Sequence, residues 1–448
     1  MNRGNALIRF GELHVELSEF EKAVECYQKS LAAFDEVFNR SPNHIEAQHN
    51  KGTVLHNLAD LQIKLSQYEK ASTNYEAAIN SIDALLKLVP GHMGALLHRG
   101  NTLIGLGDLH NELSRYDEAQ RSYEAAIATY DEILSRVDEV NAYNNKATAL
   151  RCLGELQIKL GQNQEALTSY NTALACIDEV FRHAPGSISA YNNRGGILLR
   201  IGEVQYALEE YKAAIDTYEQ ALTAFKEVLR IAPDHVDAHQ NMGNALVNIG
   251  ELQTDLSQFD SAVESLQNAL ASYDQVLKYS PDYAWAYNNK ATTLRSLGIA
   301  YSHLSKVSEA VASYEAAVAA CDEALKRSPD FATAYYNKSS ALHSHATLLY
   351  HQNLHARVIE LCKLAVVECE RALQYSPNNA RYHSKRAHLH GLMSMSQIEL
   401  SQQNEALESI VEAVKSLYRA LAIVPDDEGD LFLLNNLLGT LRRAGFSV

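Results

Sequence analysis

The stretch "AYNNKATALRCLGELQIKL", from Ala142 to Leu160, identifies the chain as a repeat protein. Close copies recur as "AYNNRGGILLRIGEVQYAL" from Ala190 and "AYNNKATTLRSLGIAYSHL" from Ala286. The apolar residues of each copy follow the i, i+3, i+4, i+7 spacing of an amphipathic helix. Self-similarity at a fixed spacing indicates that each copy belongs to one structural unit of an array.

The repeat length is 48 residues, with one repeat of 47. A glycine marks the same place in six repeats: Gly11, Gly107, Gly154, Gly202, Gly250 and Gly298. All eight prolines occupy one column: Pro42, Pro90, Pro185, Pro233, Pro281, Pro329, Pro377 and Pro425. Nine repeats therefore start near positions 1, 49, 97, 144, 192, 240, 288, 336 and 384, and a partial tenth starts near 432.

Each repeat is expected to contain two amphipathic helices. In the sixth repeat, helix A carries apolar residues up to Leu256, Ser257 and Gln258 interrupt the pattern, and helix B begins at Phe259. Asp282 follows the proline column and is expected to cap the N-terminus of the next helix A. No segment alternates between polar and apolar residues as a half-buried strand does.

These residues resemble the tetratricopeptide repeat family, whose signature is a small residue in helix A, then alanine, an aromatic and alanine in helix B, then proline. The places are taken here by Gly250, Ala262, Leu266, Ala269 and Pro281, with leucine in place of the aromatic. Family repeats are about 34 residues long, so both helices are expected to be longer than usual. The resemblance implies an all-α fold, a right-handed superhelical solenoid of nine antiparallel helix pairs plus a C-terminal capping helix at about residues 430–444. We expect one array over residues 1–448.

A basic column near the start of helix A depends on an acidic column in the preceding helix B. The acid comes 16 residues before the cation, or 15 across the shorter repeat. Where the acid is replaced by Lys226, the cation is replaced by Met242, so the two charges are present or absent together. The resemblance implies an alternative role, because some tetratricopeptide domains bind a peptide's C-terminal carboxylate with such cations. We predict salt bridges between successive repeats: Asp35–Lys51, Asp83–Arg99, Asp131–Lys146, Asp178–Arg194, Asp274–Lys290, Asp322–Lys338 and Glu370–Arg386.

An asparagine column beside these cations is a candidate binding surface, because a carboxamide both donates and accepts and can hold a peptide backbone of any sequence. Further polar or basic side chains follow at i+3 and i+7, on the same stripe of helix A. The resemblance implies that helix A lines the inner wall of the array. Alternatively, the asparagines bridge to a neighbouring helix or are merely solvated. The candidate peptide-binding residues are Asn50, Asn57, Asn145, Asn193, Arg200, Asn241, Asn244, Asn248, Asn289 and Asn337.

Composition and motifs exclude several classes of function. The net charge of −16 argues against nucleic acid, because phosphate binding needs clustered cations. Six cysteines without CxxC spacing indicate free thiols and a cytoplasmic location, and we recognise no signal peptide or membrane-spanning run. Histidines near Cys362 and Cys369 could form a metal or pH-sensing site, but their spacing matches no metal motif, so no cofactor is expected. No catalytic fingerprint is present.

The sequence thus predicts a non-catalytic scaffold that binds a protein or peptide segment along helix A. One alternative is the sensor or regulatory portion of a larger signalling protein or enzyme, and another is a structural module that only sets spacing. Arg3 has no preceding acid, which suggests a larger array or a partner that covers the first helix. Weak self-association is suggested by apolar residues on the outer face of the last helix: Leu431, Phe432, Leu433, Leu434, Leu437 and Leu438.

Overall fold

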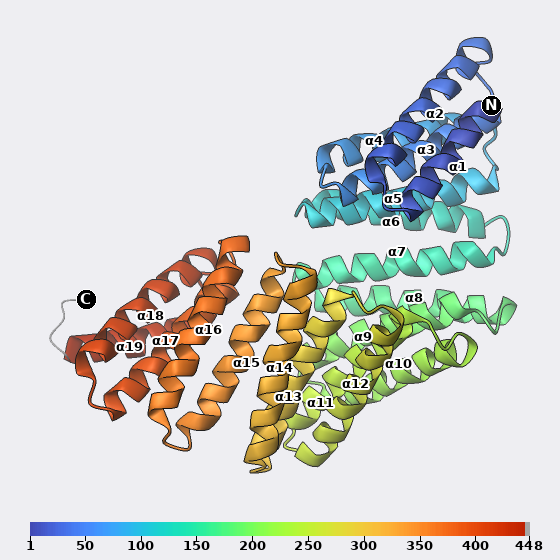
Figure 1. Ribbon diagram of the computed structural model, residues 1–448. Coiled ribbons are helices and arrows are strands. Elements are labelled where there is room, and N and C mark those ends of the chain that lie inside the picture. The colour runs from blue at the N-terminus through green and yellow to red at the C-terminus, as the bar shows by residue number, and fades with distance from the viewer. Residues whose placement is uncertain (444–448) are drawn as a thin grey trace. The chain divides into compact units, whose positions relative to one another are not determined.

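The computed structural model describes residues 1–443, and in that range it contains 19 α-helices and no strand. The odd-numbered helices are α1 (Asn2–Glu16), α3 (Ile45–Lys64), α5 (Met93–Glu112), α7 (Val140–Lys159), α9 (Ile188–Ala207), α11 (Val236–Asp255), α13 (Ala284–His303), α15 (Ala332–Tyr350), α17 (Ala380–Glu399) and α19 (Glu428–Arg443). The even-numbered helices are α2 (Phe20–Arg40), α4 (Tyr68–Leu88), α6 (Tyr116–Leu134), α8 (Asn163–His183), α10 (Tyr211–Ile231), α12 (Phe259–Tyr279), α14 (Val307–Arg327), α16 (His355–Tyr375) and α18 (Gln403–Ile423). Consecutive helices form hairpins (Figure 1), so the predicted all-α solenoid is confirmed.

The helix starts reproduce the repeat length read from the sequence. Helix α3 begins at Ile45 and α5 at Met93, which are 48 residues apart, and the same interval separates Ala284 of α13 from Ala332 of α15. The interval shortens to 47 residues between α5 and α7, which begins at Val140. The shortening falls at the end of α6 and in the connection that follows, because α6 has 19 residues where α4 and α8 have 21, whereas α5 keeps the 20 residues of α3 and α7.

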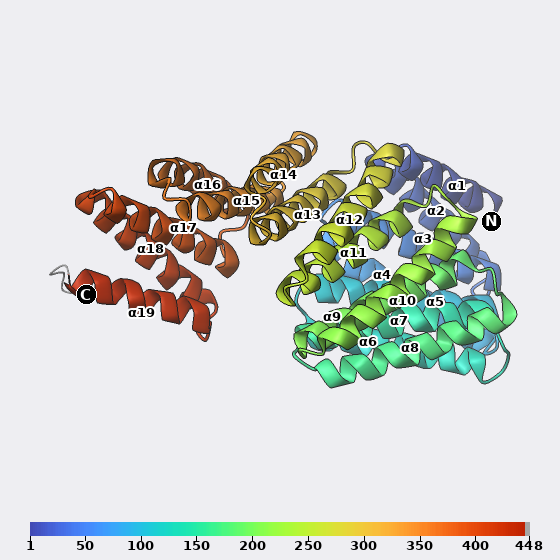
Figure 2. The same cartoon turned by 90° about the horizontal axis from the view of Figure 1, so that it is seen from below.

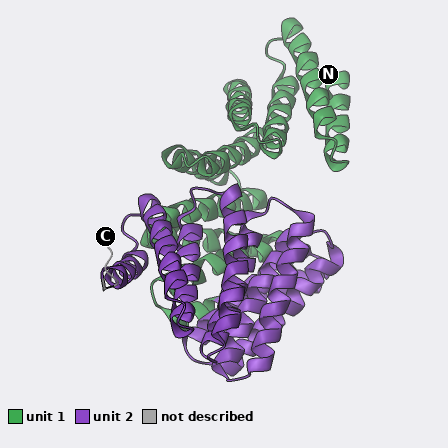
Figure 3. Cartoon of the chain, turned by 60° about the vertical axis from the view of Figure 1, so that its left-hand side comes forward, with its two compact units in different colours: residues 1–217 green, residues 218–448 purple. Residues whose placement is uncertain are grey.

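The chain forms two compact units, residues 1–217 and 218–448, which are coloured separately in Figure 3. The boundary falls within α10, so the first unit holds α1–α9 and the second holds α11–α19. Within each unit, every helix packs against its neighbours in the chain, as stacked hairpins require.

The turn inside each hairpin contains one residue with a left-handed backbone. The angle φ is 56° at Ser66, 60° at Ser257 and 74° at Gly161. The next residue closes the turn, since the backbone N–H of Gln67 donates to the carbonyl oxygen of Gln62 over 2.7 Å. This pattern is a Schellman motif, in which glycine is the least strained residue. Most repeats have serine at this left-handed position, so the packing of the two helices stabilises a backbone conformation that serine alone disfavours.

Histidine caps three of the odd-numbered helices. Nδ1 of His44, His92 and His235 accepts a hydrogen bond from the backbone N–H three residues further on. The prediction that Asp282 caps α13 is wrong, because Tyr283 holds the N-cap position and makes no capping bond through its side chain. Asp282 lies one residue too early, so its short side chain does not reach the free N–H groups of the first turn.

An aromatic ring packed against a glycine joins the two helices of several repeats. Tyr123 and Tyr170 are fully buried. A Cβ placed on Gly107 would lie 2.5 Å from Cε1 of Tyr123, and one on Gly154 would lie 2.5 Å from Cε1 of Tyr170. A side chain cannot occupy this space unless the ring moves. The glycine and tyrosine columns of the sequence are therefore two halves of one contact.

Helix α19 packs against α18 at the end of the second unit (Figure 2). Leu434, Leu437 and Leu441 are buried in this contact. The prediction that Leu434 and Leu437 lie on the outer face is therefore wrong, because they belong to the stripe that faces the core. Leu431 and Phe432 are exposed, with 71% of Phe432 accessible to solvent. Residue 444 of the predicted helix lies outside the described residues.

Candidate functional site

The odd-numbered helices of each unit form a layer of their own. Helix α3 contacts α1 and α5, and the series continues through α7 to α9. In the second unit, α11, α13, α15 and α17 contact one another in the same way. The even-numbered helices pack mainly against odd-numbered ones, which places the odd-numbered layer on the tighter side of each stack. We call the exposed side of this layer the odd-helix surface.

Asparagines link successive helices of the odd-helix surface. The Nδ2 atom of Asn50 donates to Oδ1 of Asn5 over 2.9 Å, and Nδ2 of Asn145 donates to Oδ1 of Asn101 over the same distance. In the second unit, Nδ2 of Asn289 lies 3.3 Å from Oδ1 of Asn244. The acceptor in each case lies three residues after the asparagine column of the preceding repeat.

Two members of the column use a different acceptor. Nδ2 of Asn193 donates to Oδ1 of Asn144 over 3.0 Å, and Nδ2 of Asn337 donates to Oδ1 of Asn288 over 2.9 Å. These acceptors lie one residue before the column. Thr148 and Thr292 occupy the i+3 places of the preceding repeats. Nδ2 of Asn337 also donates to Oγ1 of Thr292, over 3.3 Å. The structure thus joins these asparagines to neighbouring helices.

The remaining predicted binding residues have varied surroundings. The phenolic group of Tyr27 hydrogen-bonds to Asn57, and burial raises the pKa of Tyr27 to about 12. Asn244 also accepts a hydrogen bond from Oη of Tyr273 over 2.7 Å. Asn241 and Asn248 lie half-buried on α11, and their side chains make no hydrogen bond within the described residues. Among the candidate peptide-binding residues, the side-chain amides of Asn241 and Asn248 are therefore the ones with all their donors and acceptors open to a ligand.

The seven acid–cation pairs all form salt bridges between an even-numbered helix and the following odd-numbered one. The nitrogen–oxygen distances are 2.8 Å for Lys51–Asp35, 2.7 Å for Arg99–Asp83, 2.5 Å for Lys146–Asp131, 3.3 Å for Arg194–Asp178, 2.6 Å for Lys290–Asp274, 2.7 Å for Lys338–Asp322 and 3.2 Å for Arg386–Glu370. Each pair bridges two helix layers, so it lies at a repeat interface. Most of the acids are well exposed, and such pairs stabilise by about 0–1 kcal/mol each.

Two bridges extend into larger networks. The Lys338 ammonium also lies 3.1 Å from Oε1 of Glu368, whose side chain is only 11% exposed. The Arg386 guanidinium also contacts Glu412 over 3.1 Å and the hydroxyl of Ser416 over 2.7 Å. Glu368 also contacts Arg371 over 3.2 Å, so the loss of Lys338 leaves this buried carboxylate with one cationic partner instead of two, at a greater cost than at an exposed pair.

Tyrosine hydroxyls form a second series of bonds, to an acid 15 residues earlier in the chain. Tyr75 donates to Asp60, and Tyr123 donates to Asp108 over 2.7 Å. Tyr170 breaks the series, because its buried hydroxyl has no hydrogen-bond partner within the described residues. The acid at the matching place is Glu155, which is longer than aspartate and bonds to arginines instead.

Arg200 belongs to a charged chain that explains this exception. Nη1 of Arg151 lies 2.5 Å from Oε1 of Glu155, and Nε of Arg200 lies 3.1 Å from the same oxygen. Arg200 also contacts Glu203 over 2.8 Å. A cavity of about 340 Å³ between α7, α8 and α9 is lined by this chain, Tyr170 and apolar residues. Arg200 therefore joins the fourth and fifth repeats through Glu155 and also lines this cavity. It lies on the same stripe of α9 as Asn193.

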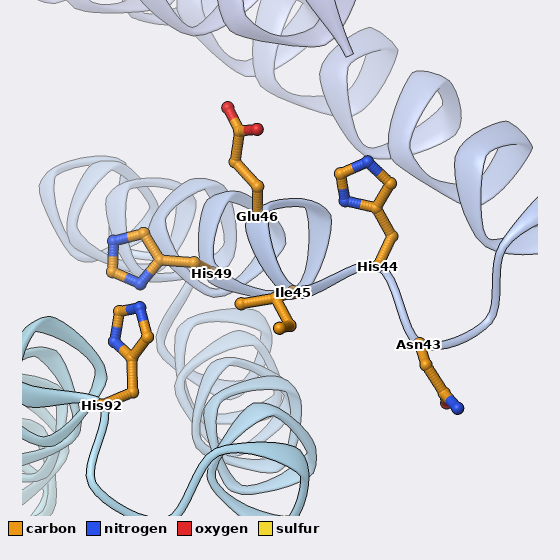
Figure 4. Close-up of a pocket in the computed structure, with 6 residues that line it drawn as sticks. All are labelled: Asn43, His44, Ile45, Glu46, His49 and His92. Atoms are coloured by element: carbon orange, nitrogen blue, oxygen red, sulfur yellow. The ribbon is translucent and has the colours of Figure 1, made fainter.

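Histidines gather at the start of the first unit. Figure 4 shows His44, His49 and His92 around an open cavity of about 500 Å³. The ring of His98 lies 5.7 Å from that of His49 and 5.4 Å from that of His56, measured between centroids. Burial, followed by the charge of His56, lowers the pKa of His98 to about 3. His98 stands where other repeats have asparagine, so the asparagine links are interrupted there.

No group of three or more histidine, cysteine, aspartate or glutamate side chains in residues 1–443 is arranged to hold a metal ion. The six cysteines are free thiols, and five of them are buried. Among the helices that the structure describes, none has the length and hydropathy needed to cross a membrane.

The acceptors Asn5, Asn101, Asn144 and Asn288 were missed as functional partners at the level of sequence. A signal for them exists, since asparagine recurs three residues after the asparagine column or directly before it. The tyrosine–acid bonds also follow a fixed interval of 15 residues. Pairing these columns requires knowledge of which helix faces lie opposite each other.

Comparison with known proteins supports the same architecture. Tetratricopeptide repeat models match residues 4–34, 52–83 and 145–227, whereas no curated protein matches the sequence significantly. The apo form of RapI has a TM-score of 0.53 at 14% identity, covering 86% of this chain and 95% of that chain. A signal transduction ATPase with a tetratricopeptide repeat sensor, from Pyrococcus horikoshii, has a TM-score of 0.52 at 11% identity, covering 89% of this chain and 54% of that chain. A tetratricopeptide repeat protein from Parabacteroides merdae has a TM-score of 0.40 at 17% identity, covering 76% of this chain and 98% of that chain.

The family matches lie in the first five repeats, and the same columns continue through the later ones. Helix pairs, packed glycine–tyrosine contacts and the proline column occur in both units. The chain therefore contains tetratricopeptide repeats, which the family models match over residues 4–34, 52–83 and 145–227.

Proposed function

We propose that the chain is a protein-interaction scaffold that holds an extended partner segment against the odd-helix surface. Tetratricopeptide repeats imply a scaffold for protein–protein interaction, which gives the general function. The place of binding is our proposal. It rests on the recurrence of oriented carboxamides along the odd-numbered helices of both units.

The bond from each asparagine to the preceding repeat leaves hydrogen-bonding capacity unused. A carboxamide has two N–H donors and an oxygen with two lone pairs. The links of Asn145 and Asn193 to the preceding repeat use one donor each, whereas Nδ2 of Asn337 donates to both Asn288 and Thr292. Acceptor capacity, and in Asn145 and Asn193 a second N–H, is therefore left to bind the main chain of a partner. The link also holds the side chain in one orientation, which lowers the entropy lost on binding.

The test uses peptides selected from a random library against the immobilised chain. Removing a carboxamide at two positions should weaken a selected peptide by about ten-fold or more, since each hydrogen bond contributes about 1 kcal/mol. The variant Asn145→Ala combined with Asn193→Ala tests the odd-helix surface of the first unit. Asn80→Ala combined with Asn171→Ala is the matched control, because both residues are exposed on even-numbered helices of the same unit.

Melting temperatures of all variants separate a loss of binding from a loss of folding. Equal weakening by the control pair, or full affinity in the Asn145→Ala, Asn193→Ala variant, would show that the segment binds elsewhere. Failure to select any peptide would contradict the scaffold itself.

A second candidate is the sensor portion of a larger signalling protein. It is motivated by the likeness to the ATPase with a tetratricopeptide repeat sensor, in which the similar part spans 54% of that chain. At 11% identity this likeness shows the fold alone. An antibody raised against the chain would detect a polypeptide well above 49.7 kDa in host extracts if this candidate is correct.

A further inference from the structure

Basic residues on the odd-helix surface of the first unit are neutralised by an acid four residues later on the same helix. Nε2 of His56 lies 3.4 Å from Oδ2 of Asp60. Nη1 of Arg151 lies 2.5 Å from Oε1 of Glu155. In these repeats the cation and its acid face the same side of the helix, as the i, i+4 spacing requires.

The second unit keeps the basic residues of this column and loses the acids. Arg295 on α13 and His343 on α15 occupy the places of Arg151 and His56. The residue four positions later is Ile299 in one case and Thr347 in the other. Neither can neutralise a positive charge.

Two further cations join Arg295 and His343. Nζ of Lys385 on α17 lies 3.3 Å from Nδ1 of His343. The Arg381 guanidinium and the Lys385 ammonium both lie over the ring of Tyr336, at 4.8 Å and 5.9 Å from its centroid. Within residues 1–443, Arg295, Arg381 and Lys385 form no ion pair with an acid. Three cations are therefore left without a negative partner: Arg295, half-buried on α13, and the half-buried Lys385 and exposed Arg381 on α17. The helix α15, which carries His343, lies between α13 and α17 in the layer.

The electrostatics of the cluster agree with this geometry. Burial and then the charge of Arg295 lower the pKa of Lys385 to about 8, and Arg381 acts in the same direction. Burial and then the charge of Lys385 lower the pKa of His343 to about 3, with a contribution from Arg295. The imidazole is neutral near pH 7, its Nδ1 accepts from Lys385, and its Nε2–H is a free donor. No carboxylate influences either group.

We propose that Arg295, His343, Lys385 and Arg381 form a binding site for a phosphoryl dianion. A half-buried cation without a partner is costly, and a bound anion removes that cost. An arginine fork, an ammonium and an imidazole N–H supply the donors that a phosphate group accepts. Three positive charges call for more than one negative charge, which distinguishes a phosphoryl dianion from a single carboxylate.

The phosphoryl group could belong to a phosphorylated side chain of a partner or to free phosphate. The site stands apart from the proposed function, because free phosphate would bind whether or not a segment lies along the odd-helix surface. Failure to select unphosphorylated peptides would therefore contradict the scaffold and leave this site standing.

The first experiment titrates the full chain with inorganic phosphate at pH 7.5 by calorimetry, with chloride keeping the ionic strength constant. We expect saturable binding that Arg295→Gln and Lys385→Gln each weaken by about ten-fold or more, since each removes a charge-assisted hydrogen bond. Arg151→Gln is the matched control, because Arg151 occupies the same column and already has an acid. Equal binding by the wild type and Arg295→Gln would overturn the site.

A second variant tests the explanation by restoring the missing acid. Ile299→Glu places a carboxylate four residues after Arg295, as Glu155 follows Arg151. If the variant melts cooperatively, we expect it to lose phosphate binding, because the internal carboxylate replaces the ligand. Undiminished phosphate binding by a folded Ile299→Glu variant would overturn the proposal.

The last arm distinguishes the source of the phosphoryl group. A library of phosphoserine peptides and the same library with serine are titrated against the wild type and Arg295→Gln. Phosphopeptides that bind at least about ten-fold more tightly than inorganic phosphate, and depend on Arg295, support a partner as the source. Affinities equal to that of phosphate support free phosphate, and absence of binding by both ligands overturns the site.

Discussion

The hydroxyl of Tyr170 is expected to destabilise its own repeat. We predict that Tyr170→Phe stabilises the fourth repeat, whereas the same substitution at Tyr123 destabilises the third. Both rings are fully buried, and both press against a glycine at a virtual Cβ distance of 2.5 Å. The two sites differ in one respect: the Tyr123 hydroxyl donates to Asp108 over 2.7 Å, and the Tyr170 hydroxyl has no partner within residues 1–443.

The magnitude follows from this difference. Burying a hydroxyl without a partner costs about 1–3 kcal/mol, so its removal should stabilise the fourth repeat by about 1 kcal/mol after allowance for relaxation. A hydrogen bond to a charged group contributes about 1.5–3 kcal/mol. Because Asp108 is largely exposed and can turn to water, we expect a loss of only about 1–1.5 kcal/mol for Tyr123→Phe.

The assay is hydrogen exchange measured by mass spectrometry, because a repeat protein opens locally and only a local measurement assigns the change to one repeat. A change of 1 kcal/mol alters the opening equilibrium by about five-fold. Peptides from α7 and α8 should exchange about five-fold more slowly in Tyr170→Phe. Peptides from α5 and α6 should exchange about five-fold or more faster in Tyr123→Phe.

Faster exchange in α7 and α8 of Tyr170→Phe would refute the reasoning. It would mean that the hydroxyl has a partner in solution, such as Glu155 after a rotation of its side chain or a water held in the adjacent cavity. The single substitution Glu155→Asp, with Tyr170 intact, would then distinguish the two, because aspartate restores the partner found in the preceding repeats.

Three further outcomes are expected. Lys338→Met should lower the free energy of unfolding in urea by about 1–3 kcal/mol, because Glu368, which is 11% exposed, keeps only Arg371 as a partner. Lys290→Met should lower the free energy of unfolding by about 0–1 kcal/mol, and equal effects would contradict the role of burial. Gly107→Ala should destabilise the folded chain by about 1–3 kcal/mol in a thermal melt, because the new methyl group meets the ring of Tyr123. Gly196→Ala should instead stabilise α9 by up to about 1 kcal/mol, because no atom lies within 4 Å of the new methyl group and alanine favours the helix. Because the pKa of His98 is lowered in the folded chain, the unfolded chain takes up this proton at a higher pH. The contribution of His98 to the free energy of unfolding is therefore fully present above pH about 6.5 and is lost as the pH falls toward about 3. The loss is at most about 1.4 kcal/mol per pH unit. His98→Asn should flatten that slope in urea midpoints between pH 7 and pH 5, and an unchanged slope would assign it to other groups.

The sequence by itself determined the repeat, its length and the pairing of charges between repeats. These features are readable because each depends on a fixed interval along the chain. Asp274 and Lys290, for example, lie at matching distances from the turn at Pro281, so the connection between two helices brings them to the same height. The glycine and tyrosine columns are likewise set by the geometry of one hairpin.

Only the tertiary structure decided which side chains meet across successive odd-numbered helices. Asn50 reaches Asn5, while Asn193 reaches Asn144. The same holds for Tyr170, where one extra methylene in Glu155 turns the carboxylate toward Arg200. Such contacts depend on the rotation between repeats and on side-chain reach. Neither quantity has a period in the sequence, because both arise from the packing of many residues at once.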